Sequence, residues 1–204
     1  RQRTDTWRRE QSHGANQQTV KITGHDVSYL STPDNRVRSF YAVDGRYHLV
    51  TTSRTIVRRF FEAGQGQEAL GSSTEFRHAR SVLPVDRDDT IFVYLSTDFF
   101  EGLIRPKYRI ELRRRLQSVT DIEILQLARL AARAEKQSGD SIKDLVRAGL
   151  VPDGFGQRAD GSQLIEKQGR VLDSLRGARG SFTPIADMQL DSVTAAESRD
   201  YEAL

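Results

Sequence analysis

The chain has four histidines, the side chains best suited to bind a metal or move a proton near neutral pH. They are His13, His25, His48 and His78. No two of them form a close H-x-H or H-x-x-x-H pair, which zinc sites commonly contain. His25 and Asp26 would suit a base with its orienting acid, but His25 follows a glycine and is more simply a turn residue. His48 alternates with Tyr47 and Leu49, so it faces solvent if those two side chains point inward.

Serine and glycine motifs give no clearer sign of catalysis. Ser53, Ser73 and Ser96 lack the Gly-x-Ser-x-Gly elbow of hydrolases, and the first two fit helix N-caps instead. The glycines of segment 64–71 follow an expected helix rather than a strand, and no Lys-Ser/Thr pair follows them. We therefore expect them to end a helix and not to bind phosphate.

The acidic residues offer two further candidates. Asp86, Asp88 and Asp89 have the composition of a calcium loop, but they lack the glycine and the final glutamate of an EF-hand. A solvated loop is the simpler interpretation. Asp98 and Glu101 could pair as acid and base, although Asp98 more simply fits the first turn of a helix.

A basic cluster is the best binding signal in the chain. Its members are Arg105, Lys107, Arg109, Arg113, Arg114 and Arg115, with Glu111 as the one acid among them. Arg105, Arg109 and Arg113 share a face at helical spacing and could follow the phosphates of a polyanion. The simpler interpretation is a solvated helix face, and no aromatic residues alternate along it to stack on bases.

Composition limits the remaining choices. The 204 residues carry a net charge of only +3, so nucleic acid is disfavoured as a partner despite the basic pI of 9.3. There is no cysteine, hence no disulfide and no thiolate metal site. No apolar run reaches about 18 residues, so we expect no membrane span. The chain begins at Arg1 rather than Met, and we interpret it as part of a longer protein.

These residues must be positioned by an α+β fold. Residues 19–52 form four short runs separated by a break at Gly24 and by turn signals at 33–35 and 44–45, which predict an antiparallel β-meander. Ser53 should cap a helix with Ile56, Val57, Phe60 and Phe61 inward. A capping box from Ser72 to Glu75 should open a short helix, and residues 90–96 should form a central strand.

The second half of the chain is expected to be mainly helical. Tyr108, Leu112, Leu116 and Val119 mark one apolar stripe, and segment 120–123 could cap a second helix that continues through residue 134. Ser141 to Asp144 fits a capping box, and residues 163–166 with 170–172 suggest a small hairpin near the Asp160-Gly161 turn signal. After Gly177 the chain should wrap or be irregular. The expected domains are a terminal segment 1–18, an α+β domain 19–104, a helical segment with a hairpin 105–180, and an irregular tail 181–204.

Segment 45–100 resembles uncharacterised bacterial repeat domains of extracytoplasmic proteins. A strand ending in Thr/Ser-x-Ser, a helix, a Ser-Leu-x-x-Ser-x-x-Phe-like stretch, an Ala-x-x-x-Leu-Pro helix end and a Tyr/Leu-rich strand make up the family's unit. The positions that match it are Leu70, Ser73, Phe76, Ala79, Leu83 and Pro84. The whole also resembles parts of the large exported proteins of planctomycete-type bacteria. The resemblance implies a fold and an extracytoplasmic setting, and it brings no assigned activity.

We therefore predict a non-enzymatic scaffold or protein-interaction domain of a larger, exported bacterial protein. Its partners would be other domains of the same polypeptide or another protein. No catalytic, cofactor-binding or metal-binding residue is predicted, and the oligomeric state stays open. The alternative function is polyanion or nucleic-acid binding through the basic helix 105–115. A hydrolase would need His25 or His48 beside a carboxylate in a pocket.

Overall fold

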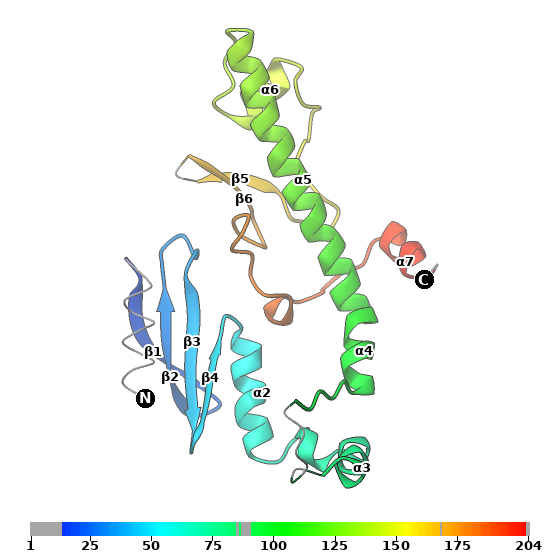
Figure 1. Cartoon of the computed structure of the whole chain (residues 1–204). Coiled ribbons are helices and arrows are strands. Elements are labelled where there is room, and N and C mark those ends of the chain that lie inside the picture. The colour runs from blue at the N-terminus through cyan, green and yellow to red at the C-terminus, as the bar shows by residue number, and fades with distance from the viewer. Residues whose placement is uncertain (1–13, 85, 87–90, 168, 203–204) are drawn as a thin grey trace. The chain divides into compact units, whose positions relative to one another are not determined.

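The computed structural model describes residues 14–84, 86, 91–167 and 169–202. These residues divide into two compact units. Of the described residues, the first unit comprises those in 14–33 and 37–108, and the second comprises those in 34–36 and 109–202. The predicted α+β class, with an antiparallel meander backed by helices and followed by a helical segment and a small hairpin, is confirmed (Figure 1).

Unit 1 contains a four-stranded antiparallel sheet in the order β1-β2-β3-β4. Its strands are β1 (Asn16–Ile22), β2 (His25–Ser31), β3 (Arg38–Asp44) and β4 (Tyr47–Thr51). Ile22 pairs with His25 and Asp44 with Tyr47, so both outer hairpins have two-residue turns. Thr23 and Gly24 both take positive φ in the first turn, as the tight turns that match the strand twist require.

Helix α2 (Arg54–Gly64) covers one face of this sheet. The sheet and the helix share an apolar core, whose buried residues are Ile22, Val27, Phe40, Ala42, Val57 and Phe61. The sequence offers Tyr41, Val43, Leu49 and Val50 as packing partners of Phe60 and Phe61. Leu49 does pack against this core with Phe60, whereas Tyr41 pairs with Val50 on the opposite face. Side chains alternate along a strand, and the register places Phe40 and Ala42 under the helix instead.

Serine caps open the helices of unit 1. The Ser53 hydroxyl accepts a hydrogen bond from the amide of Ile56, as predicted. Helix α3 (Thr74–Val82) follows the short 3-10 helix η1 (Leu70–Ser72), and its cap is Ser73, whose hydroxyl accepts from the amide of Phe76. The predicted box starting at Ser72 was therefore wrong by one residue, although the separate prediction of Ser73 as a cap is confirmed.

The predicted central strand at 90–96 is wrong for the residues that can be described. Residues 91–96 have no regular secondary structure, and Ile91 and Val93 are 79% and 73% exposed; Thr90 lies outside the described residues. Their β-branched and aromatic composition favours a strand only where a neighbouring strand offers its edge. Helix α4 (Thr97–Ile104) follows, with Asp98 in its first turn as expected. Its cap is Ser96, which was not predicted as a cap.

Unit 2 is built on one long helix, α5 (Pro106–Ala134) (Figure 1). The expected start of a second helix at Thr120 was wrong, because α5 continues through that residue. Helix α6 (Ile142–Arg147) opens with the predicted Ser141–Asp144 capping box. The hairpin has β5 (Leu164–Lys167) and β6 (Arg170–Asp173), close to the predicted bounds. The last segment is more ordered than expected, because it holds η2 (Ile185–Asp187) and α7 (Ala195–Glu202).

Unit 2 has an apolar core in the C-terminal half of α5. It consists of Ile122, Leu125, Ala128, Ala132, Leu145, Val151 and Leu164. Alanine at two of these positions lets the following segment approach closely: a Cβ on Gly139 would lie 2.7 Å from that of Ala132. The N-terminal half of the same helix face is different, because its buried residues include Glu111, Arg114 and Ser118.

Candidate functional site

The buried polar half of α5 lies at the centre of an ion-pair network, which is the first feature of unit 2 that could support chemistry. Arg176, 1% exposed, donates to both carboxylate oxygens of Glu111 at 2.8 and 3.1 Å and to Asp160 at 2.6 Å. It also reaches Asp173 at 3.3 Å, and Asp173 accepts a hydrogen bond from the Ser118 hydroxyl. One guanidinium therefore joins α5 to the turn at 160 and to the end of β6.

Two further arginines extend this network. Arg158 donates to Asp173 at 2.6 Å and to Asp121 at 2.8 Å. Arg114, 7% exposed, forms a fork with Glu197 of α7 at 2.6 and 2.9 Å, and it also donates to a backbone carbonyl at Ser192. The C-terminal helix is thus attached to α5 by charged hydrogen bonds.

The pKa shifts of Asp160, Glu197 and Arg176 favour the charged form of each of these groups. Burial raises the pKa of Asp160, but hydrogen bonds from Ser162 and Arg176 outweigh it and bring the pKa to about 2. The hydrogen bond from Arg114 is the largest cause that lowers the pKa of Glu197 to about 2. Burial lowers the pKa of Arg176, but the hydrogen bonds that Arg176 donates to Glu111 and Asp160 outweigh it and raise the pKa above its ordinary value. A general acid or base needs a pKa near the working pH, so these carboxylates suit structure better than proton transfer.

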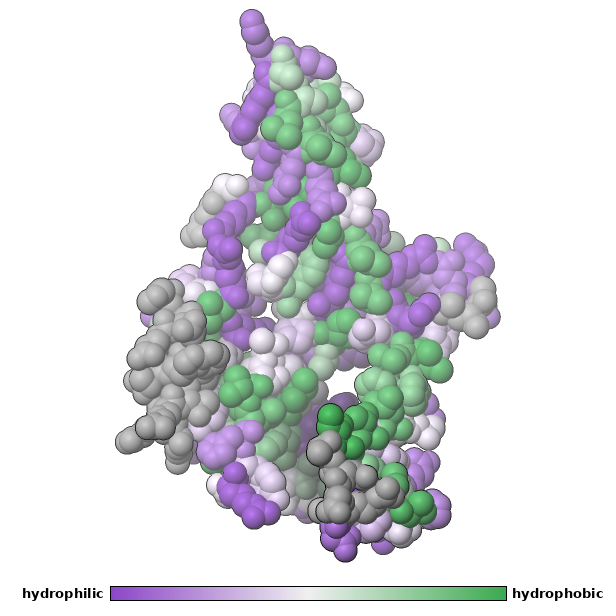
Figure 2. Space-filling view, in the orientation of Figure 1, coloured by the Kyte–Doolittle hydropathy of each residue, from purple (hydrophilic) through white to green (hydrophobic). Residues whose placement is uncertain are grey.

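The opposite face of α5 carries an apolar surface, which we call the leucine stripe: Leu112, Leu116, Val119, Leu127 and Leu130. Leu116, Leu127 and Leu130 are 62%, 65% and 59% exposed. At about 100° per residue, the stripe lies about 180° around the helix from the buried residues Arg114, Ser118, Leu125 and Ala132. Figure 2 shows hydrophobic surface along α5. Sequence periodicity found the stripe of Leu112 and Leu116, but unit 2 buries the other face.

The predicted basic cluster is divided by this geometry. Arg114 and Arg115 are turned into unit 2, where Arg115 pairs with Glu111 at 3.3 Å and donates to the carbonyl of Thr183. Arg113 pairs with Asp200 of α7. Arg105 and Arg109 are exposed, and Lys107 is half-buried. The six side chains therefore do not share one solvent-facing surface.

The other candidates are dispersed through unit 1. The ring of His25, the first residue of β2, stacks on Phe61 with centroids 4.0 Å apart. His48 is exposed, and its Nδ1 lies 2.8 Å from the Tyr41 hydroxyl. His78 is exposed on α3. His13, Asp88 and Asp89 lie outside the described residues. Among the residues that are described, no group of three or more His, Cys, Asp or Glu side chains could hold a metal ion.

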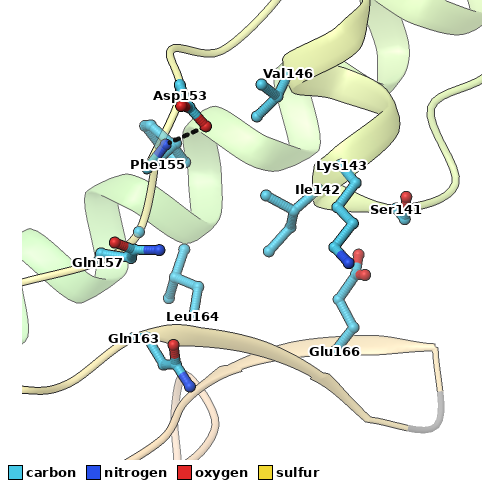
Figure 3. A pocket seen from close by; sticks show the side chains of 12 residues that line it. Ser141, Ile142, Lys143, Val146, Asp153, Phe155, Gln157, Gln163, Leu164 and Glu166 are labelled. Carbon is cyan, nitrogen blue, oxygen red and sulfur yellow. Dashed lines mark hydrogen bonds between the residues drawn. The ribbon is translucent and has the colours of Figure 1, made fainter.

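A groove of about 440 Å³ lies in unit 2 between α6, the 153–157 loop and β5 (Figure 3). Ile142, Val146 and Leu164 give it an apolar lining, and Gln157 and Gln163 stand at its border. Its volume is within the range of small-molecule sites. A smaller cavity of about 250 Å³ is lined by Arg114, Arg158, Asp160 and Glu197, but these groups already pair with one another or with other residues of the network.

Comparisons with family models, curated proteins and solved structures found no match to this chain. Within the described parts of the chain, no helix is both long and apolar enough to cross a bilayer.

Proposed function

We propose that this chain is a non-enzymatic protein-interaction domain of a larger, exported bacterial protein, and that it binds through the leucine stripe. The observation that carries the proposal is that α5 has a buried charged face and an exposed apolar face. Its inward face is held by paired charges, while its outward face presents leucines that are more than half exposed. An amphipathic helix with an exposed apolar stripe is a recurrent surface for helix-in-groove or helix–helix binding.

The ion-pair network supports this role because it fixes the position of α5. Arg114 and Arg176 fix α5 to segments 160–176 and 192–197 through contacts on the face opposite the stripe. A binding surface on a rigid helix loses little conformational entropy when a partner docks. The resemblance of segment 45–100 to extracytoplasmic repeat domains supports the setting in a larger exported protein. The partner would be another domain of that polypeptide or a separate protein.

The polyanion alternative has less support from the contacts. Arg113, Arg114 and Arg115 each pair with an internal carboxylate. Releasing Arg114 would leave Glu197 without its partner, and truncating one member of a buried ion pair is costly. A filter-binding titration with heparin tests this function: affinity that falls steeply with salt would favour it over the leucine stripe.

Hydroxyl-radical footprinting tests the stripe directly, because it measures how much of each leucine reaches solvent. Leu116 and Leu127 should be oxidised in the dilute isolated chain and protected in the full-length protein from its native host. Leu175, 51% exposed in the loop after β6, is the matched control and should be oxidised equally in both. Equal oxidation of Leu116 in the two preparations would refute the proposed function.

A further inference from the structure

The spacing of the leucine stripe is symmetric about the middle of α5. Leu112 and Leu130 lie nine residues on either side of position 121. Leu116 lies five residues before that position and Leu127 six after it, while Val119 and Glu123 lie two residues on either side. A second α5 running in the opposite direction would therefore set each large leucine against another large leucine.

From this symmetry we propose that the leucine stripe binds a second copy of the chain, through an antiparallel α5–α5 pair with its two-fold axis near residue 121. The proposal rests on the proposed function and names its partner. An isologous two-fold interface requires a patch that is complementary to itself. The stripe meets this requirement in sequence spacing and in the exposure of its leucines.

Charge favours the antiparallel direction. Arg113, Arg114 and Arg115 are paired internally, and Arg105 and Arg109 are exposed near the N-terminal end of the helix. A parallel pair would place these exposed arginines of both copies at one end, where they repel, whereas an antiparallel pair separates them to opposite ends. Glu123 is the one acidic residue in line with the stripe, and Arg179 contacts it at 2.6 Å. This contact reduces repulsion between the two Glu123 side chains near the axis.

The size of the stripe sets the strength of the pair. From Leu112 to Leu130 the helix rises about 27 Å, and a helix with side chains is about 11 Å wide, which gives a contact of roughly 300 Å² per copy. This lies below the area of permanent dimers and in the class of weak, transient interfaces. The stripe follows an 11-residue pattern, with 112 to 123 and 116 to 127, and a repeat of this length gives a right-handed supercoil along the contact. We infer a weak monomer–dimer equilibrium, in which the dimer is populated only at high protein concentration.

Sedimentation equilibrium from low to several hundred micromolar concentrations tests the association. The parent chain should shift from monomer to dimer, and Leu116→Glu should weaken the dimer at least tenfold. Leu175→Glu introduces the same charge at an exposed leucine outside α5 and should leave association unchanged. Circular dichroism would verify that both variants are folded. A parent chain that is monomeric at every concentration would overturn the proposal, as would equal effects of the two variants.

Disulfide cross-linking tests the direction, because the chain has no cysteine of its own. Leu112→Cys and Leu130→Cys chains, oxidised separately, should give little cross-linked product. Mixing them should give a cross-linked pair of one chain of each kind. Efficient cross-linking of each variant with itself would show a parallel pair and overturn the antiparallel arrangement. A monomeric chain whose Leu116 is nonetheless protected in the full-length protein would remove the dimer and leave the proposed function standing.

Discussion

Arg176 is the residue whose removal should most damage unit 2. Its guanidinium contacts Glu111, Asp160 and Asp173, whose side chains are 3%, 4% and 0% exposed. Arg176→Met keeps much of the volume but leaves all three carboxylates without this cation. Breaking one buried pair costs about 3–5 kcal/mol. Because the three contacts are coupled and not additive, we expect the free energy of unfolding to fall by about 4 kcal/mol or more.

Two comparison variants separate charge from geometry. Arg176→Lys keeps the positive charge but loses the planar fork that reaches several carboxylates, so it should lose about 2 kcal/mol. Arg147→Met removes an ion pair with Asp144 in which the arginine is 80% exposed, and it should cost less than about 0.5 kcal/mol.

The assay must follow unit 2 by itself, because two units need not unfold in a single transition. Hydrogen exchange of peptides from α5 at increasing urea concentrations gives the local free energy of opening. The reasoning would be refuted if Arg176→Met lowered this value by less than about 1 kcal/mol, or if Arg147→Met lowered it as much.

Two further predictions concern the stability of unit 2 at low pH and the effect of adding a Cβ at Gly156. Asp160 and Glu197 have folded pKa values of about 2, below those of an unfolded chain, so their stabilisation is complete above about pH 4 and is lost as the pH falls towards 2. Urea unfolding at pH 7 and pH 3 should show unit 2 weaker at pH 3; equal stability would contradict these pKa values. Gly156→Ala would place a Cβ 2.9 Å from Leu164, whereas Gly161 has similar positive φ and nothing within 4 Å. Thermal melts should show Gly156→Ala less stable than Gly161→Ala by about 1–3 kcal/mol, and equal melts would exclude the steric contact.

Local sequence signals predicted much of the fold. The Asp44-Gly45 turn signal, the alternation around it and the serine caps depend on interactions within a few residues, and the hairpin, Ser53, Ser73 and the Ser141 box were found from them. The strand at 90–96 failed because its composition indicates burial, and burial depends on a neighbour that the segment itself does not specify.

The character of α5 shows most clearly what the sequence determined by itself. Its helical character and its leucine spacing were readable, although its unbroken length was not, because helical periodicity is a property of neighbouring turns. Only the tertiary structure decided which face is inside. Glu111 is paired with Arg176, 65 residues away, and Arg114 with Glu197, 83 residues away. A charged side chain can be buried when its partner is brought to it, and that partner is set by the folding of distant segments, so periodicity alone could not assign the buried face.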